Sequence, residues 1–316
     1  MENLKNKSSI KGRGKMKTFG KKTAVMILLA AMVLSLMSCV QVNTNPTDGA
    51  ANTEADTKAA AGGNRLEQIK AAGKMTVATE PYFAPQEFID PSKEGQEQYV
   101  GADIEFAHLI ADKIGVEVEI VPLEFTAVVP SVSEGKYDIA ISALAWTPER
   151  AEALELSEGY YFSKTTTGYG LMIRTEMAEQ IKSADDLGDY VVITQSGSLQ
   201  EAMVNDQVPS YKEFKRVSSM QDAFLAVQES KADAAAVSIP NAQLYIDNNP
   251  DCGMMIVPDF KFNMNEEYLG TRCGVKKGET EFMALVNEVI AEMLESGVYE
   301  KWYDEYSEYA GTLGID

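Results

Sequence analysis

Histidine is almost missing from this chain of 316 residues: His108 is its single example. His108 falls within the helical pattern "ADIEFAHLIADKIG", where we interpret it as a residue on a helix face. A lone histidine argues against a histidine-based metal site and against a Ser-His-Asp triad, because each needs a histidine among suitable partners. We therefore predict no metal, no cofactor and no catalytic residue.

Cysteine is also scarce, with Cys39, Cys252 and Cys273 as the only three. Neither Cys252 nor Cys273 stands near a plausible catalytic partner. Two leftover thiols in an exported chain most often form a disulfide. A disulfide between Cys252 and Cys273 is therefore an expectation, although the sequence gives no distance between their Cα atoms.

Positive charge is the third shortage, with 28 lysine and arginine residues against 48 aspartate and glutamate residues. Eight of the 28 lie in residues 1–38, where Glu2 is the one acid, so the rest of the chain carries 20 basic and 47 acidic side chains. Such a chain repels phosphate groups at long range. We therefore predict that the chain binds no nucleic acid, and it is a poor candidate for an anionic lipid surface.

The N-terminal segment differs in character from everything after it. Lys21 and Lys22 precede the apolar run "TAVMILLAAMVLSLMS", and roughly 15 apolar residues are short for a membrane span. Residues 1–38 therefore predict a secretory signal, with Met16 as an alternative start. An uncleaved anchor helix is the other interpretation, and both place the remaining chain outside the cytoplasmic membrane.

The signal ends in "LMSC", which resembles a bacterial lipobox, although Met37 is a less usual occupant of its position. The resemblance implies that Cys39 is lipidated and anchors the chain to the outer face of the cytoplasmic membrane. Residues 39–64 have almost nothing to bury and predict a flexible tether. About 250 residues then remain, enough for two modest domains or one large domain.

From Lys74 onward, strand patterns alternate with helix patterns. A first series runs "KMTVATE", "YVGADIEFAHLIADKIG", "VEVEIVPLE", "AVVPSVSEGK" and "YDIAISAL", and a second series includes "DYVVITQ", "EFKRVSS" and "ADAAAVSI". Alternation of this kind indicates βαβ units. We therefore expect an α/β fold with two similar lobes, each a mixed, mainly parallel sheet flanked by helices.

We expect the ligand-binding residues to lie where the predicted strands end, because ligands of open α/β sheets bind beyond the carboxyl ends of strands. One such place is "ATEPYFAPQEF", which carries Glu80 and Phe83. Another is "TQSGSLQE", where Gly197 and Ser198 begin a helix whose N–H groups suit an anion. Each residue also has a plainer interpretation: a solvated acid, a core aromatic or a turn glycine.

The third place is "ISALAWTPER", in which a buried strand runs straight into a helix start. Thr147 suits the N-cap and Pro148 suits the first helical position. Arg150 is unexpected there, since a cation gains nothing from the positive end of the helix dipole. Arg150 is either a solvated charge, or it binds a carboxylate group together with the loop that contains Ser198.

Six stretches in order resemble a known family, the extracytoplasmic solute-binding proteins that deliver polar amino acids to ABC importers. They are "VATEPYFAPQEF", "VGADIEFAHLIADKIG", "FTAVVPSVSEGKYDIAISALAWTPER", "SADDLGDYVVITQSGSLQE", "KADAAAVSIPNAQLY" and "LESGVYEKWYDEY". The resemblance covers roughly residues 65–310. It implies the type II periplasmic-binding-protein fold, with one lobe formed by residues 65–164 and 266–316 and the other by residues 165–265.

The resemblance also assigns roles within a ligand site. It makes Arg150 the clamp on the ligand α-carboxylate and gives Ser198 and Leu199 backbone N–H groups aimed at the same carboxylate. The remaining implied contacts are the loop Ser142, Ala143 and Ala145, the aromatic residues Phe83 and Phe125 on either side of the ligand, and the acid Glu80 near its side chain.

Two positions depart from the family pattern. Ala145 stands where many members carry Ser or Thr, which removes a hydroxyl contact. Ser238 stands where an aspartate usually pairs with the α-ammonium, and a hydroxyl brings no countercharge. Either Glu80 neutralises the ammonium or the ligand is not an ordinary α-amino acid; Asp222 and Asp233 fit a helix start and a strand start better.

These expectations add up to a lipid-anchored, monomeric binding protein that traps an amino acid or related small carboxylate and presents it to an ABC permease. An exported enzyme on the same scaffold, a dehydratase or a lytic transglycosylase, would need a general acid or base, for which Glu80 is the one candidate. A sensor module that reports ligand to a separate protein is the other alternative. The sequence leaves the identity of the ligand open.

Overall fold

The structure is a computed structural model that describes residues 64–162 and 168–315. The signal segment, Cys39 and all but the last residue of the tether fall outside the described residues, as does the crossover at 163–167. None of the helices in the described ranges has the length and apolar character needed to cross a membrane.

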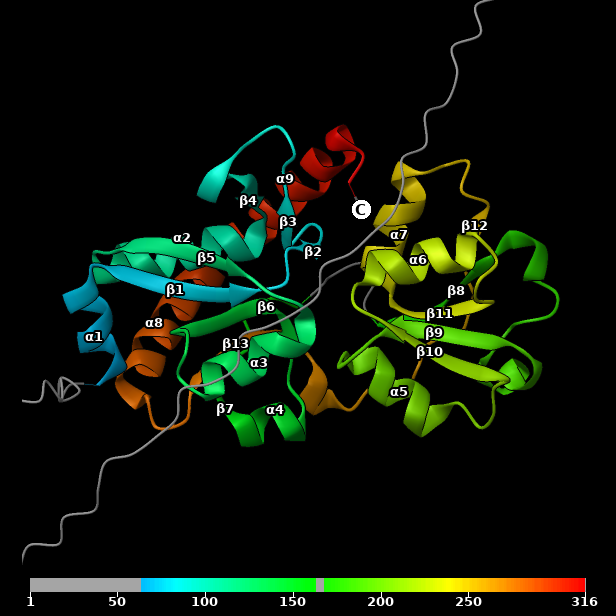
Figure 1. The fold of residues 1–316 in the computed structure, drawn as a ribbon, viewed down its shortest axis with the longest axis horizontal. Coiled ribbons are helices and arrows are strands. Elements are labelled where there is room, and N and C mark those ends of the chain that lie inside the picture. Colours follow the sequence, from blue (N-terminus) through cyan, green and yellow to red (C-terminus); the bar gives the residue numbers. More distant parts are fainter. Residues whose placement is uncertain (1–63, 163–167, 316) are drawn as a thin grey trace, which may run out of the picture. The chain divides into compact units, whose positions relative to one another are not determined.

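The first of two large sheets is assembled from segments far apart in the chain (Figure 1). Its order is β5-β1-β6-β13-β7, in which β1 pairs in parallel with β5 and β6, whereas β13 is antiparallel to β6 and β7. The strands are β1 (Lys74–Thr79), β5 (Glu117–Pro122), β6 (Ile139–Ala145), β7 (Leu154–Leu156) and β13 (Thr271–Lys276).

The second sheet repeats this plan with the order β10-β9-β11-β8-β12. Here β9 pairs in parallel with β10 and β11, and β8 is antiparallel to β11 and β12. The strands are β8 (Tyr169–Arg174), β9 (Val191–Gln195), β10 (Glu213–Val217), β11 (Ala234–Ser238) and β12 (Met254–Ile256). Both sheets are mixed, as predicted, and parallel pairing is confined to three strands of each.

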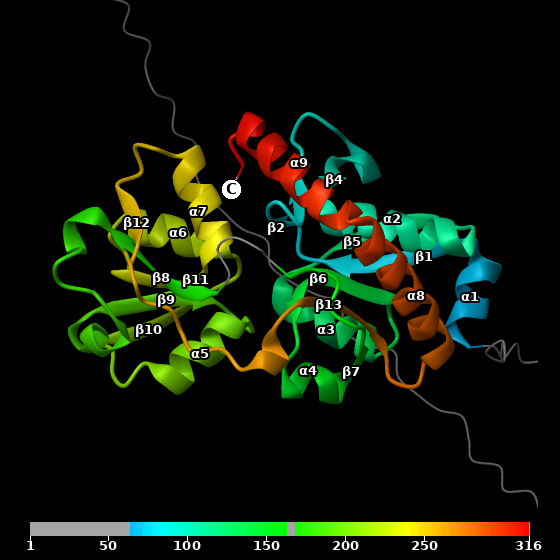
Figure 2. The same ribbon diagram turned by 180° about the vertical axis from the view of Figure 1, so that it is seen from behind.

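Helices cover both faces of the first sheet, because its strands carry apolar side chains on both sides. One face packs on α1 (Arg65–Ala72), α2 (Ala102–Ile114), α8 (Thr280–Ser296) and α9 (Val298–Leu313), which together enclose the largest buried cluster. Figure 2 shows α8 and α9 running along this face. The other face packs on α3 (Phe125–Ser133), and α4 (Pro148–Ala153) lies beside α3.

The second sheet is likewise enclosed on both faces. One face buries Leu199, Met203 and Val204 of α5 (Leu199–Gln207) together with Leu187 of the 3-10 helix Ala184–Asp189. The other face packs on α6 (Met220–Gln228) and α7 (Ile239–Asn248). Short 3-10 helices also cover Gly95–Gln98, Thr175–Met177 and Glu266–Tyr268.

A third, small sheet was not predicted. Its strands β2 (Tyr82–Phe83), β3 (Glu87–Ile89) and β4 (Tyr99–Val100) pair antiparallel in sequence order. Segments of two or three residues are too short to show an alternating pattern. This sheet fixes Phe83 opposite Glu87, and both side chains line the pocket described below.

Gly101 joins this small sheet to α2 in a way that only glycine allows. Its φ is +131°, and a Cβ atom built on it would lie 2.2 Å from the backbone oxygen of Gln86. We expect Gly101→Ala to lower the free energy of unfolding by more than ~2 kcal/mol through backbone strain and this clash. Urea denaturation measures the loss. Gly115→Ala is the matched control, since Gly115 has a φ of +84° but open space around it, and an equal loss in both variants would contradict the role of the clash.

The expected disulfide does not form: Cys252 and Cys273 are both free thiols. Cys273 lies on β13 within the core of the first sheet. Cys252 packs beside the helices of the second sheet. The two thiols therefore belong to separate hydrophobic cores, a separation that the linear sequence does not reveal.

Candidate functional site

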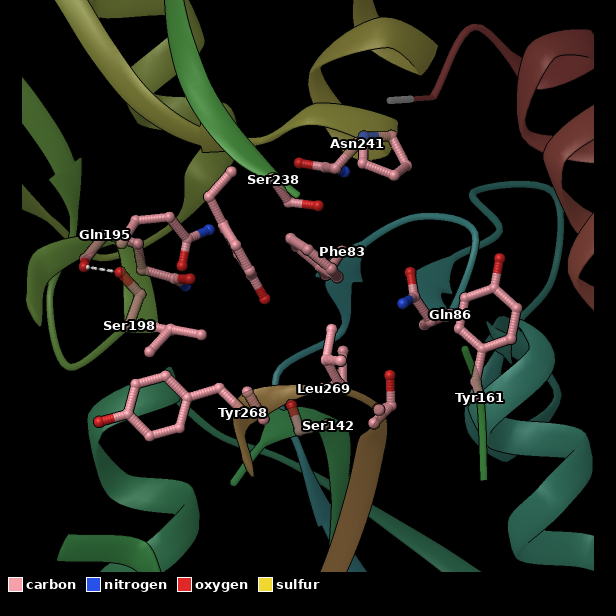
Figure 3. A pocket seen from close by; sticks show the side chains of 18 of the residues that line it. Phe83, Gln86, Ser142, Tyr161, Gln195, Ser198, Ser238, Asn241, Tyr268 and Leu269 are labelled. Carbon is pink, nitrogen blue, oxygen red and sulfur yellow. Dashed lines mark hydrogen bonds between the residues drawn. The ribbon is translucent and has the colours of Figure 1, made fainter. Parts of the chain in front are cut away.

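The parallel strands of both sheets direct their carboxyl ends toward one pocket with a volume of about 370 Å³. Glu80 follows β1, Ala145 ends β6, Gln195 ends β9 and Ser238 ends β11. The pocket wall includes all ten residues predicted as ligand contacts: Glu80, Phe83, Phe125, Ser142, Ala143, Ala145, Arg150, Ser198, Leu199 and Ser238. Figure 3 shows Ser142 and Ser198 on different parts of this wall.

Arg150 is held in place by local structure. Thr147 caps α4 by accepting a hydrogen bond from the Arg150 backbone N–H at 3.2 Å, and Pro148 occupies the first turn, as predicted. The guanidinium donates to the carbonyl oxygen of Ala145 at 2.8 Å and to that of Gly197 at 3.2 Å. These two carbonyls belong to different sheets, so Arg150 contacts both sides of the pocket.

Arg150 is a buried cation without a countercharge. Its exposed fraction is 8 %, and it forms no ion pair with any residue in the described ranges. Burial lowers the pKa of its guanidinium to about 10, so it stays charged at neutral pH. A buried charge is costly unless it is paired. An anion bound in the pocket would pair with the guanidinium of Arg150 and offset this cost.

Aromatic rings frame this cation. The guanidinium carbon of Arg150 lies 5.4 Å from the centroid of the Phe125 ring, within the range of a cation–π contact. Trp146, just before the cap, stacks on Tyr268 with ring centroids 5.8 Å apart and an interplanar angle of 27°. Tyr268 and Phe83 both line the pocket, so its wall is largely apolar around a few polar groups.

Residues 142–145 were predicted as a loop, but they belong to strand β6 and are bonded to groups behind the pocket. Ser142 Oγ accepts from the backbone N–H of Glu80 at 3.0 Å and donates to Glu87 Oε1 at 3.3 Å. The backbone N–H of Ala143 donates to Asp103 Oδ2 at 2.9 Å. Ala143 has a φ of 47°, in the left-handed region that alanine seldom adopts. Backbone groups of Ser142, Ala143 and Ala145 were expected to flank the ligand, but the N–H of Ala143 already donates to Asp103.

Asp103 is the centre of a fully buried network that the sequence did not reveal. Besides Ala143, its carboxylate accepts from Tyr160 Oη at 2.8 and 2.9 Å and from Tyr299 Oη at 2.5 Å. Tyr160 and Tyr299 come from positions 57 and 196 residues away along the chain. This network holds the strained backbone of β6 at Ala143 in position.

On the second sheet, the glycine loop is more internally bonded than predicted. The N–H of Gly197 donates to Glu201 Oε2 at 2.6 Å, and Ser198 Oγ donates to the carbonyl of Gln195 at 2.7 Å. The backbone N–H of Ser198, expected to face the ligand carboxylate, also donates to the Gln195 carbonyl, at 3.4 Å. The Ser198 hydroxyl also accepts from the Glu201 N–H at 3.2 Å, which caps α5. Ser198 and Leu199 line the pocket, but the Gly197 N–H is already occupied by the Glu201 carboxylate.

Several polar residues of the pocket wall were missed by the sequence argument. Gln86, Gln195 and Asn241 line it together with Ser238 (Figure 3). Asn241 has an exposed fraction of 3 %; its Nδ2 donates to the carbonyl of Ala84 at 3.1 Å, and its Oδ1 has no partner. Asn241 follows Ser238 by three residues, so proximity to a predicted site residue was the one available signal.

Glu80 is a buried acid, with an exposed fraction of 3 %. Burial raises the pKa of its carboxyl to about 8, and the nearby acids Glu124 and Asp222 act in the same direction, while a hydrogen bond from Gln195 opposes them. Glu80 is therefore largely protonated in the ligand-free protein at neutral pH. A cation placed beside it would favour the ionised form.

We expect Glu80→Gln to stabilise the ligand-free protein at high pH. Because the folded-state pKa is raised, the unfolded state loses its proton first, and Glu80 weakens stability progressively as pH rises from about 4.5 to about 8. The variant should gain on the order of 3 kcal/mol at pH 8 and nothing below pH 4.5. Denaturation of both proteins across this range tests the expectation; a difference that does not change with pH would contradict it.

Comparison with known proteins gives this site its context. The model of the bacterial extracellular solute-binding proteins, family 3, matches residues 75–309. The chain belongs to this family. The predicted membership is thereby confirmed, and with it the two-lobed fold, since solved structures similar to this one are amino-acid-binding proteins.

Individual members of the family show what this chain is similar to. The arginine-binding extracellular protein ArtP of Bacillus subtilis is 28% identical over 232 residues, which cover 72% of this chain and 84% of that protein. A substrate-binding protein from Streptococcus pneumoniae, solved with L-arginine, has a TM-score of 0.70 and 28% identity over 78% of this chain and 98% of its own. An ancestral arginine-binding protein solved with glutamine has a TM-score of 0.64 and 29% identity, covering 74% of this chain and 97% of its own.

Membership in family 3 also decides between a binding protein and an enzyme. The curated relatives and solved neighbours are amino-acid-binding transport proteins. The prediction that this family 3 protein is not an enzyme is therefore confirmed.

Proposed function

We propose that this protein is the lipid-anchored, substrate-binding component of an ABC importer. It captures an amino acid or a related small carboxylate between its two lobes and delivers it to the membrane permease as a monomer. One lobe comprises residues 65–164 and 266–316, and the other comprises residues 165–265. The arginine named for ArtP and for the Streptococcus pneumoniae protein supports an amino acid as the ligand class.

The observation that carries this proposal is the unpaired, buried guanidinium of Arg150. Arg150 binds the ligand carboxylate, since a bidentate pair satisfies the charge that the two carbonyls leave uncompensated. Ser198 and Leu199 close on the same group from the second sheet. Phe83 and Phe125 contact the body of the ligand, and Ser142, Ala143 and Ala145 form the edge of its site.

At the amino end of the ligand, Glu80 and Ser238 take the place of the usual aspartate. Ser238 offers a hydroxyl oxygen, and Glu80 provides the negative charge once a cation lies beside it. Closure of the lobes follows from ligand contacts to both of them, because a ligand stabilises the closed state only through its differential affinity.

Ligand capture is tested by mass spectrometry of small molecules released from the purified protein, followed by calorimetry against the twenty common amino acids. We expect at least one amino acid to bind and to raise the melting temperature. If no amino acid and no other small carboxylate binds, the proposal fails. Export and anchoring are tested separately, because Cys39→Ser should release the protein from cells into the medium without changing its affinity.

A further inference from the structure

The charged side chains of the pocket limit the charges that a ligand can bring. Among the described residues of the pocket wall, Arg150 is the single cation, and Glu80 and Glu87 are the two acids. All three are buried, with exposed fractions of 8 %, 3 % and 1 %. In such surroundings each charge of a bound ligand needs a partner, because an unpaired charge taken out of water is expensive.

The carboxylate of Glu87 interacts with other groups of the protein itself. Its Oε1 accepts from Ser142 Oγ at 3.3 Å, whereas its Oε2 is buried and receives no hydrogen bond. Burial and the neighbouring Asp103 carboxylate raise the pKa of Glu87 well above its ordinary value. Glu87 therefore offers no free carboxylate oxygen to a ligand, because Ser142 occupies Oε1 and Oε2 is buried.

Glu80 is the acid that remains for the ligand. Its backbone is fixed by Ser142, and its carboxyl accepts a hydrogen bond from the side chain of Gln195. The other titratable groups that act on it, Glu124 and Asp222, are both acids. Glu80 forms no ion pair with a described cation, so its carboxyl is available to pair with one positive charge of a ligand.

The other polar side chains of the wall that the structure describes carry no charge. Gln86, Gln195, Ser238 and Asn241 are neutral hydrogen-bonding side chains that surround the apolar ring of Phe83 (Figure 3). The unpartnered Oδ1 of the buried Asn241 calls for a donor such as an amide or hydroxyl group. These groups satisfy a neutral polar side chain but leave a second charge of a ligand uncompensated.

We infer that the pocket selects amino acids with an uncharged side chain, with the carboxylate on Arg150 and the α-ammonium on Glu80. This inference rests on the proposed function and narrows its ligand class. An arginine or lysine ligand would bring two cations to one acid, and a glutamate ligand would bring two anions to one cation. The chain therefore departs in specificity from the relatives that are named for arginine.

Competition calorimetry with glutamine, asparagine, serine, tyrosine, arginine, lysine and glutamate at pH 7.5 tests the inference. We expect one of the uncharged amino acids to bind at least 10-fold more tightly than arginine, lysine and glutamate. Tightest binding of any of these three charged amino acids would overturn the inference while leaving the proposed function intact. If none of the seven binds but another small carboxylate does, the inference also fails, and if neither binds, the proposed function fails as well.

The isosteric variants Glu80→Gln and Glu87→Gln show which of the two acids pairs with the ligand ammonium. We expect wild type to release a proton on binding between pH 6 and pH 8, measured in buffers of different ionisation enthalpy. Glu80→Gln should remove this release and weaken binding of the preferred amino acid at least 10-fold. Glu124→Gln is the matched control outside the pocket wall and should change affinity less than 3-fold. If Glu87→Gln removes the proton release and Glu80→Gln does not, the assignment of the acids is wrong.

Discussion

Replacing Arg150 by methionine is expected to abolish ligand binding while leaving the ligand-free protein at least as stable as wild type. Methionine keeps the apolar stem but removes a buried guanidinium that has no described countercharge. Removing an uncompensated charge from the interior costs no stability, whereas the ligand carboxylate loses its charged partner. A loss of at least about 100-fold in affinity follows from the strength of charge-assisted bidentate pairs.

Calorimetry and urea denaturation on the same samples check both parts of this expectation. Arg174→Met is the matched control, because Arg174 also donates to two backbone carbonyls, those of Val227 and Ala232, but forms an ion pair with Asp233. Arg174 does not line the pocket, so its variant should lose stability and keep affinity. Retained ligand binding in Arg150→Met would show that the carboxylate is bound elsewhere.

Replacing Asp103 of α2 by alanine is expected to be the most destabilising single change in the lobe built on the first sheet. The hydroxyl groups of Tyr160 and Tyr299 and the N–H of Ala143 would all lose their acceptor in a fully buried place. We expect a loss of at least ~3 kcal/mol in the free energy of unfolding. Ligand affinity should fall as well, since the strained backbone at Ala143 would no longer be held.

Urea denaturation measures this loss, with Glu105→Ala as the control. The carboxylate of Glu105 accepts a single hydrogen bond, from Tyr306, at a partly buried position. Its removal should cost about 1 kcal/mol or less. Equal losses for the two variants would show that Asp103 is an ordinary acceptor and not the centre of a network.

Local rules in the sequence were sufficient for part of the site. The cap at Thr147 and the proline at the start of α4 follow from the residue types, and they place Arg150 one turn into that helix. The chain alternates strands and helices, and strands that pair in parallel end at the same edge of a sheet. For this reason Glu80, Ala145 and Ser238 gather around one pocket although they are distant in sequence.

Other parts depend on contacts that no local pattern encodes. Asp103 lies in the regular helix α2, and only tertiary packing brings Tyr160 and Tyr299 to its carboxylate. The strand β13 pairs with β6, although more than 120 residues separate them along the chain. Local sequence patterns cannot predict such a pairing. Cys273 on β13 therefore lies in a different hydrophobic core from Cys252, and the predicted disulfide was wrong.

The stacking of Trp146 on Tyr268 gives the protein an intrinsic optical probe. Trp146 directly precedes the cap of the helix that carries Arg150, while Tyr268 lines the pocket. The chain has one other tryptophan, Trp302, which lies in α9 and packs against the core of the first sheet. Indole fluorescence thus contains one component in contact with a residue of the pocket wall and one remote reference, so occupancy can be followed without attaching a dye.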